Sequence, residues 1–251
     1  MLKTDKVTIK FGGLTAVNEV SVHIKPNQIT GLIGPNGAGK TTFFNCISGV
    51  YTPNSGKVMF QGKEIQGFKP YQINKLGITR TYQNINLFRK MTVQENVLVG
   101  MHSRLKSNYL TDMFHIPSQQ REEKEAYAKA YEWLKFVGLE PYAKDQTGSL
   151  SYGKQRLLEI VRGLASDPKL ILLDEPAAGM NSQEKLELDE LLQRILKLGV
   201  TILMVEHDMK LVMNVCHEIY VLAEGKLLAH GTPEEVQNNP DVITAYLGGD
   251  E

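Results

Sequence analysis

The sequence predicts an α/β protein in which an open, mostly parallel sheet is interrupted by a helical insertion. Two continuous apolar runs, residues 170–173 and 200–205, are typical of strands buried on both faces of a parallel sheet. A glycine-rich loop separates the apolar run 29–33 from a stretch with helical spacing. Residues 91–165 are charged, helical in period and poor in β-branched runs, so we expect a helical subdomain inserted into the α/β core.

The order of elements follows from periodicity and turn signals. Short strands are expected at residues 7–9 and 20–24, where apolar and polar residues alternate, and another at 57–60 after the punctuating Gly56. Helices are expected at 41–48, 119–137, 184–198 and 209–216, and a last strand at 218–222. We interpret the chain as a single domain, 1–251. Residues 1–90 and 166–251 would form the α/β core with a small antiparallel β subdomain, and 91–165 the helical subdomain.

Composition limits the classes of function. Lys and Arg number 28, as do Asp and Glu, so a zero formal charge provides no long-range field for nucleic acid, and we expect no nucleic-acid partner. Cys46 and Cys216 have no metal-like spacing and indicate free thiols in a reducing cytosol. The apolar runs are far shorter than the roughly 20 residues that span a bilayer. If the protein works at a membrane, another chain is expected to cross it.

The glycine-rich loop matches the phosphate-binding pattern G-x-x-x-x-G-K-[ST] between a strand and a helix. Glycines let successive backbone N–H groups turn toward an anion, and the helix N-terminus adds positive potential. The lysine would contact the β- and γ-phosphates, and the first threonine would bind Mg²⁺. The alternative is a tight strand–helix turn. We therefore expect ATP and Mg²⁺ as ligands, with the nucleotide contacted by Gly34, Pro35, Asn36, Gly37, Ala38, Gly39, Lys40, Thr41 and Thr42.

Two carboxylates follow the buried run 170–173. Asp174 and Glu175 would lie at the carboxyl edge of the sheet, where ligands bind in open α/β folds. Asp174 can hold the metal through water, and Glu175 could act as the general base that orients the attacking water. An ordinary acidic turn after a strand is the alternative, and the phosphate loop earlier in the chain argues against it.

Residues 150–155, Leu-Ser-Tyr-Gly-Lys-Gln, precede an amphipathic helix. Ser151 could simply cap that helix, although the capping-box glutamate is absent because Lys154 stands three residues on. A serine hydroxyl with glycine N–H groups at a helix start also makes an anion site. Because the phosphate loop already provides one such site, this segment suggests a second contact to a nucleotide.

Together these segments resemble an ABC-type ATPase over nearly the whole chain, which implies a P-loop NTPase (RecA-like) core. The Leu-Ser-x-Gly-x-Gln element is the specific part. The resemblance implies that Gln83 senses Mg²⁺ and water, that His207 holds the γ-phosphate, and that Phe11 stacks on adenine. It also implies that Ser151 and Gly153 contact the nucleotide of the opposite subunit. Gln83 could instead be a loop residue, His207 a strand-end cap and Phe11 a core residue.

Two departures from the family pattern touch the expected dimer interface. Tyr152 replaces the first glycine of the usual Gly-Gly pair, while Gly153 is kept. Asn181 stands where an aspartate is usual in the loop after Glu175. Both changes bear on the rate and the pairing partner more than on the reaction.

Within the family, the closest resemblance is to the ATPases of branched-chain amino-acid (leucine, isoleucine, valine) importers. It is carried by residues 11–17, the insert around 105–133, residues 174–179 and the tail 239–248. It implies transmembrane permease subunits, a second ABC ATPase in a homo- or heterodimer, and indirectly a substrate-binding protein. It also implies a peripheral position on the cytoplasmic face of the cell (inner) membrane. The ATPase of a urea, other amino-acid or amide importer, a lipopolysaccharide-export ATPase, and a soluble ABC-type ATP switch remain alternatives. A nucleotide kinase lacks the residue 150–155 signature.

Overall fold

The computed structural model describes residues 1–101 and 117–247, and these divide into two compact units. The first joins Met1–Gln83 to the C-terminal part from Lys169, and the second is Asn84–Pro168. The predicted helix at 119–137 is present as α4, Pro117–Phe136. The structure therefore has the α/β class with a helical insertion that the sequence predicts.

A six-stranded sheet forms the centre of the α/β unit, in the order β11-β10-β4-β9-β8-β7. All its pairs are parallel except β10 with β11. Strands β4, β8 and β9 are buried at every position, as expected of a sheet covered on both faces. Its strands are β4 Ile29–Ile33, β7 Ile78–Arg80, β8 Leu170–Asp174, β9 Thr201–Val205, β10 Glu218–Ala223 and β11 Lys226–Gly231.

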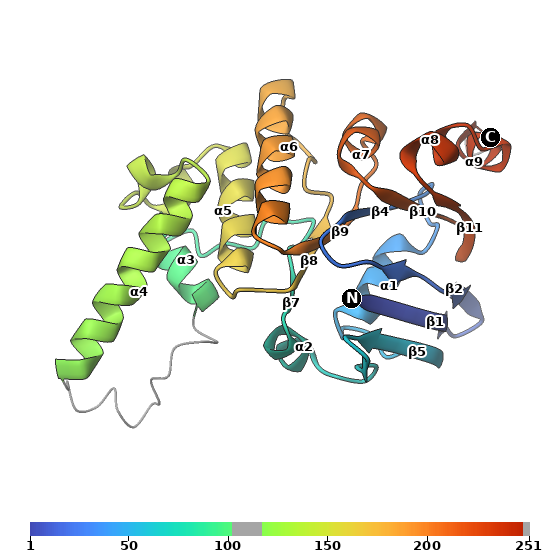
Figure 1. Ribbon diagram of the computed structural model, residues 1–251, viewed down its shortest axis with the longest axis horizontal. Helices are drawn as coiled ribbons and strands as arrows, with labels where there is room; N and C mark the ends of the chain where they lie inside the picture. Colours follow the sequence, from blue (N-terminus) through green and yellow to red (C-terminus); the bar gives the residue numbers. More distant parts are fainter. Residues whose placement is uncertain (102–116, 248–251) are drawn as a thin grey trace. The chain divides into compact units, whose positions relative to one another are not determined.

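A second, antiparallel sheet has the order β2-β1-β5-β6, with β3 also paired to β1. Its strands are β1 Leu2–Phe11, β2 Leu14–Val20, β3 His23–Ile24, β5 Ser55–Phe60 and β6 Lys63–Glu64. Figure 1 shows helix α1, Lys40–Ile47, on the side of the parallel sheet that faces these strands. Phe43 and Phe44 of α1 belong to one buried core with residues of both sheets, so α1 is held on two sides.

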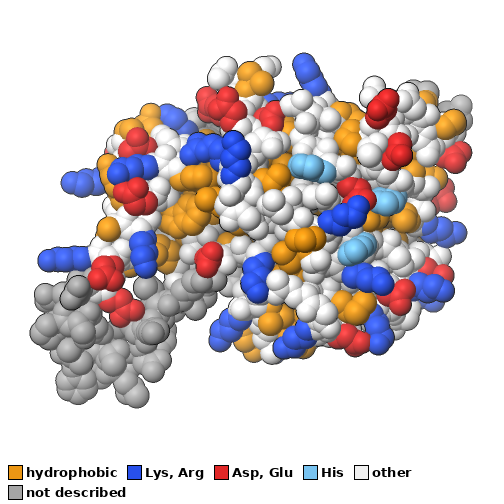
Figure 2. Space-filling view, in the orientation of Figure 1, with side chains coloured by type: hydrophobic (Ala, Val, Ile, Leu, Met, Phe, Trp, Pro, Cys, Tyr) orange, Lys and Arg blue, Asp and Glu red, His pale blue; other side chains and the backbone are white. Residues whose placement is uncertain are grey.

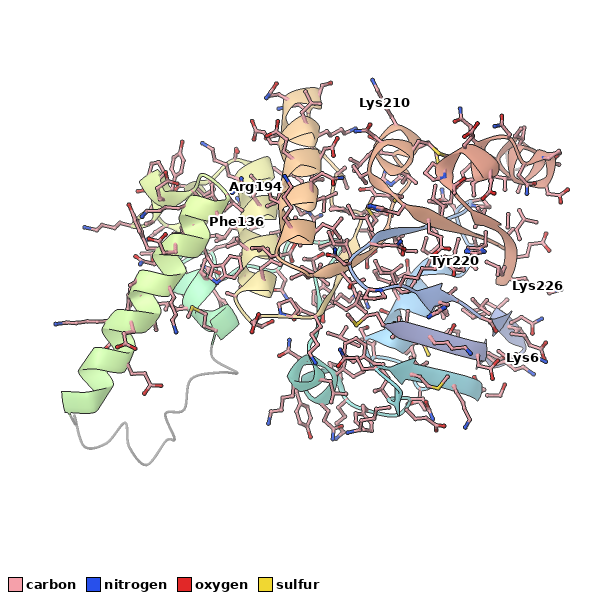
Figure 3. All side chains as sticks on the ribbon, in the orientation of Figure 1. Lys6, Phe136, Arg194, Lys210, Tyr220 and Lys226 are labelled. Carbon is pink, nitrogen blue, oxygen red and sulfur yellow. The ribbon has the colours of Figure 1, made fainter. Side chains whose placement is uncertain are left out.

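The remaining helices of this unit are α2 Pro70–Leu76, α6 Ser182–Lys197, α7 Met209–Val215, α8 Pro233–Gln237 and α9 Pro240–Leu247. Helices α6 and α7 lie on the opposite side of the parallel sheet from α1 (Figure 1). Tyr220 of β10, labelled in Figure 3, hydrogen-bonds through its hydroxyl to the backbone of His23 and stacks on His230. On the face drawn in Figure 2, acidic and basic side chains are interspersed, in keeping with the zero formal charge.

Two sequence predictions were wrong in detail. The expected strand at 20–24 is not one element: β2 ends at Val20, and β3 covers only His23–Ile24. The strand at 218–222 is not the last one, because Glu224 and Gly225 make a tight turn with positive φ and β11 follows. Residues 226–231 gave no clear strand signal because the burial of β11 does not alternate regularly.

The helical unit contains α3 Val93–Met101, α4 Pro117–Phe136, α5 Tyr152–Leu164 and the short 3-10 helices Glu140–Tyr142 and Thr147–Ser149. Helix α3 contacts both α4 and α5. A Cβ added at Gly100 would lie 2.0 Å from the Arg162 carbonyl oxygen, so only glycine permits this approach of α3 to α5. Part of the sequence resemblance, the insert around residues 105–133, extends over residues outside those described.

A fully buried ion pair stabilises the helical unit. Arg156 donates to Glu159 Oε2 at 2.8 Å, and both side chains are at most 1% exposed. Glu159 Oε1 also accepts from the backbone N–H of Asn86 at 3.2 Å, which ties α5 to the start of the unit. Burial raises the pKa of Glu159, and the charge of Arg156 opposes that effect.

Replacement of Glu159 by Gln is expected to lower the free energy of unfolding by about 3 kcal/mol, because it leaves a buried guanidinium without its carboxylate. Urea denaturation followed by helical circular dichroism measures the change. Glu132→Gln is the matched control, since Glu132 forms an exposed i,i+3 pair with Lys135, and solvent-exposed pairs contribute little to stability. Equal losses in the two variants would show that burial does not distinguish the pairs.

Candidate functional site

The phosphate-loop pattern lies between β4 and α1, with its backbone turned by glycines. Gly34, Gly37 and Gly39 all have positive φ, at 148°, 78° and 94°. A Cβ at Gly34 would lie 2.0 Å from the Leu222 carbonyl oxygen, and one at Gly39 would lie 2.4 Å from that of Ala16. These positions therefore require glycine for conformation and for space. Gly39 is the N-cap of α1 and offers no side-chain cap, so the first backbone N–H groups of α1 have no capping side chain.

Lys40 is directed back over this loop. Its Nζ donates to the carbonyl oxygens of Gly34 at 2.6 Å and Pro35 at 2.8 Å. An ammonium group has three donors, so the loop carbonyls occupy two of them. Burial lowers the pKa of Lys40, while the nearby charge of Glu175 acts in the opposite direction. Thr41, the next residue, is exposed at the start of α1.

Asp174 ends β8 and is 4% exposed. Its Oδ2 accepts a hydrogen bond from Arg80 at 2.7 Å, and the Arg80 side chain is itself 7% exposed. Arg80 also donates to Asn45 Oδ1 and Ser48 Oγ of the α1 region at 2.6 and 2.9 Å. The guanidinium thus joins β7, β8 and the α1 region. Sequence analysis missed Arg80, because a single arginine at the end of a three-residue strand carries no periodic or motif signal.

Gln83 and His207 both approach one carboxylate oxygen of Glu175. Gln83 Nε2 donates to Glu175 Oε2 at 2.9 Å, and His207 Nδ1 lies 3.7 Å from the same oxygen. Glu175 has φ 47°, a left-handed conformation that costs an L-residue roughly 1–3 kcal/mol. Its backbone N–H bonds to Val205 O at 2.9 Å, which holds the turn beside β9. The structure therefore brings together the three residues that were predicted to be catalytic.

Phe11 lies at the end of β1 and is 45% exposed. Its ring makes an edge contact with Tyr51, with 5.2 Å between the ring centroids. Phe11 is therefore a surface residue, and the alternative in which it packs in the core is wrong.

Ser151 and Gly153 lie in the helical unit, at the beginning of α5. Ser151 is the N-cap, and its Oγ accepts from the backbone N–H of Lys154 at a long 3.5 Å. Ser151 is exposed, whereas Gly153 is buried. Tyr152 is 45% exposed, and its hydroxyl lies 3.4 Å from a nitrogen of Arg156. The capping role suggested by the sequence is present, but at 3.5 Å it is a weak hydrogen bond.

The sequence matches a known family. The sequence profile of the ABC transporter family matches residues 17–178, a span that begins before the phosphate loop and ends after Glu175. The chain belongs to the ABC transporter family. It is an ATPase of this family, and it binds nucleotide. A second profile, described as the branched-chain amino acid ATP-binding cassette transporter, matches residues 226–251.

Individual relatives agree with this assignment of the ABC ATPase. The chain is 47% identical over 249 residues to the high-affinity branched-chain amino acid transport ATP-binding protein LivG of Escherichia coli (strain K12). It is 46% identical to BraF, of the same description, from Pseudomonas aeruginosa. Each match covers 99% of this chain and 98% of the relative.

Solved structures show the same fold for the ABC ATPase. The ADP conformation of the ATP-binding cassette MJ1267 has a TM-score of 0.85 at 31% identity, covering 99% of this chain and 98% of that one. The dimeric, post-hydrolysis cassette MJ0796, bound to ADP and Pi, has a TM-score of 0.78 at 26% identity. That match covers 93% of this chain and 99% of that one. These likenesses confirm the P-loop NTPase class.

Proposed function

We propose that this ABC ATPase binds and hydrolyses ATP to power the import of branched-chain amino acids. The relatives that cover almost the whole chain, LivG and BraF, are described as branched-chain amino acid transport ATP-binding proteins. The C-terminal residues 226–251 match a profile of the same transporter type. This tail match supports the substrate class over the urea-import and lipopolysaccharide-export alternatives.

One observation supports the hydrolytic role. Glu175 Oε2 accepts a hydrogen bond from Gln83 and faces His207, at the edge of the sheet that bears the phosphate loop. Glu175 is the general base that orients the attacking water. Gln83 holds the Glu175 carboxylate by its amide and senses Mg²⁺ and the attacking water. His207, whose side chain is 64% exposed, is available to contact the γ-phosphate.

The residues of the phosphate loop fit an ATP triphosphate, because Gly34, Gly37 and Gly39 turn the backbone and Lys40 supplies the positive charge. Phe11 and its neighbour Tyr51 offer an exposed aromatic surface for adenine. All the predicted nucleotide contacts are retained in the proposal: Gly34, Pro35, Asn36, Gly37, Ala38, Gly39, Lys40, Thr41, Thr42 and Phe11.

Thr41, Gln83 and, through water, Asp174 are the residues that would hold Mg²⁺. Oxygen donors of these kinds suit Mg²⁺, which is usually bound by one or two carboxylates together with substrate phosphates. The exposed Thr41 hydroxyl and the Asp174 oxygen not bonded to Arg80 fit that requirement. Bound Mg²⁺ would neutralise charge on the β- and γ-phosphates. Arg80 fixes Asp174 through the hydrogen bond at 2.7 Å, so one of the proposed ligands is held in place by the chain itself.

The active form is a dimer of ABC ATPases. The cassette MJ0796 forms a dimer with ADP and Pi, and its likeness extends over 93% of this chain. Ser151 and Gly153 would contact the nucleotide bound by the opposite subunit, with Ser151 exposed for that contact. The partner is a second copy or a related ATPase, and no nucleic acid is involved.

The ATPase works with transmembrane permease subunits and, through them, with a substrate-binding protein. It is peripheral on the cytoplasmic face of the cell membrane. Among the described residues, the structure contains no helix that is both long enough and apolar enough to span a bilayer. The alternative, a soluble ATP switch, shares the ATP chemistry and differs only in its partners.

Uptake of labelled leucine, isoleucine and valine tests the function directly. Cells that lack this chain but keep the rest of the transporter should recover uptake with the wild-type protein, and Glu175→Gln is the matched inactive control. A pull-down from gently solubilised membranes should recover permease subunits together with an ATPase partner. If urea uptake recovered instead, the proposed substrate class would be urea. If the pull-down recovered only soluble partners, the soluble ATP switch would be favoured.

A further inference from the structure

Glu206 is a buried carboxylate that none of the assigned steps uses. It follows β9 directly, is 1% exposed as a residue, and precedes His207 in the chain. Burying a carboxylate costs several kcal/mol unless its oxygens are hydrogen-bonded. The surroundings of Glu206 therefore decide what this residue does.

Three backbone N–H groups meet the two oxygens of Glu206. Oε1 accepts from Ala177 N at 2.7 Å, and Oε2 accepts from His207 N at 3.0 Å and Asp208 N at 3.2 Å. The imidazole nitrogen of His207 lies 3.9 Å from Oε2, too far for a hydrogen bond. Lys210 of α7 points away from the sheet (Figure 3). The carboxylate is thus held by backbone donors of two different turns.

Those two turns carry the catalytic residues. Ala177 is two residues after Glu175, in the turn that leaves β8, and His207 is in the turn that leaves β9. Strands β8 and β9 are parallel neighbours whose last pair is Asp174 with Val205. The strand pairing ends there, and the Glu206 side chain continues the connection between the segments that follow β8 and β9. Hydrogen bonds to a carboxylate are roughly twice as strong as neutral ones, so the bridge is stiff.

We propose that Glu206 is a positioning residue that sets the spacing between Glu175 and His207. By joining the amide of Ala177 to those of His207 and Asp208, its carboxylate keeps the two turns in register. His207 Nδ1 consequently stays 3.7 Å from Glu175 Oε2. This inference rests on the proposed roles of Glu175 and His207 in ATP hydrolysis. Glu206 is buried and its oxygens are bonded to backbone N–H groups, so its loss should affect kcat and leave ATP binding intact.

Two substitutions of Glu206 remove different hydrogen bonds of the bridge. Glu206→Gln keeps the size of the side chain but replaces one acceptor oxygen with an NH₂ group, which faces backbone N–H groups and cannot accept from them. Glu206→Asp keeps the charge and shortens the side chain by one methylene. An aspartate can still accept from the backbone N–H groups of its own turn, but it no longer reaches Ala177.

Hydrogen exchange of the full chain reads the bridge directly. In Glu206→Asp, the amide of Ala177 should exchange faster while those of His207 and Asp208 stay protected. In Glu206→Gln, which keeps one acceptor oxygen, the turn that faces the NH₂ group should lose protection. Asp208→Asn is the matched control, because Asp208 caps α7 through Leu211 N and pairs with Lys185 without contacting Ala177. Its Ala177 amide should exchange at the wild-type rate.

Steady-state ATPase assays give the functional readout. In both Glu206 variants kcat should fall by roughly 10- to 100-fold, as small displacements of reacting groups allow, with KM for ATP within about twofold. A wild-type kcat in Glu206→Asp despite faster Ala177 exchange would overturn the positioning role. Unchanged Ala177 exchange in Glu206→Asp would overturn the bridge itself. If the wild-type chain hydrolysed no ATP, the proposed function would fail first, and exchange would still report on the bridge.

Discussion

Replacement of Glu175 by Gln should abolish ATP turnover while ATP still binds. The substitution preserves the shape of the side chain, so the backbone turn at Glu175 and the contact with Gln83 can persist. It removes the carboxylate that would accept a proton from the attacking water. General-base catalysis contributes about 10²- to 10⁴-fold, and kcat should fall by that amount. Because the bound ATP is no longer hydrolysed, the variant should accumulate as an ATP-bound dimer.

Phosphate release measures kcat, and size-exclusion chromatography with ATP and Mg²⁺ measures the dimer. The matched control is Glu184→Gln, since Glu184 also follows β8 but its carboxylate accepts from the backbone N–H of Asn181, the N-cap of α6. That variant should keep its turnover and remain monomeric or dimeric as the wild type does. If Glu175→Gln lowered kcat by less than about tenfold, the loss would be smaller than removal of a general base predicts. Glu175 would then have to be replaced in that role.

The parallel sheet could be predicted because its central strands consist almost entirely of apolar residues. Strands β8 and β9 are buried on both faces, so each reads as an unbroken apolar run. Helix α4 could be predicted from its long helical period. Strands β3 and β7 are two and three residues long and present no period to read. Their positions depend on pairing with distant strands rather than on local preference.

The site was predictable where a motif fixes residue type and spacing, as in the phosphate loop and the Asp174-Glu175 pair. Gln83 and His207 entered only through the family resemblance, and the structure places both beside Glu175 Oε2. Arg80 and Glu206 were missed for a physical reason. Their partners, Asp174 and Ala177, are 94 and 29 positions away in sequence, and only the folded sheet brings them together.

Replacement of Lys40 by Ala should weaken ATP binding by roughly 10- to 100-fold. The ammonium group already donates to the carbonyl oxygens of Gly34 and Pro35, which orient it over the loop. A phosphate oxygen would accept from it as a charged partner, and hydrogen bonds to charged groups contribute about 1.5–3 kcal/mol. Each 1.4 kcal/mol corresponds to about a tenfold change in Kd, which gives the expected range.

Titration calorimetry or a fluorescent ATP analogue measures Kd for the Lys40→Ala variant, with Lys57→Ala as the control. Lys57 is also a lysine in an ion pair, with Glu64, but that pair is exposed on the antiparallel sheet. Both substitutions remove one positive charge, so the difference between them isolates the contact at the loop from the change in net charge. If the ammonium contacts the β- and γ-phosphates as proposed, Lys40→Ala should weaken ATP binding more than it weakens AMP binding. Equal losses for the two nucleotides would mean that Lys40 supports the fold of the loop and does not contact the terminal phosphates.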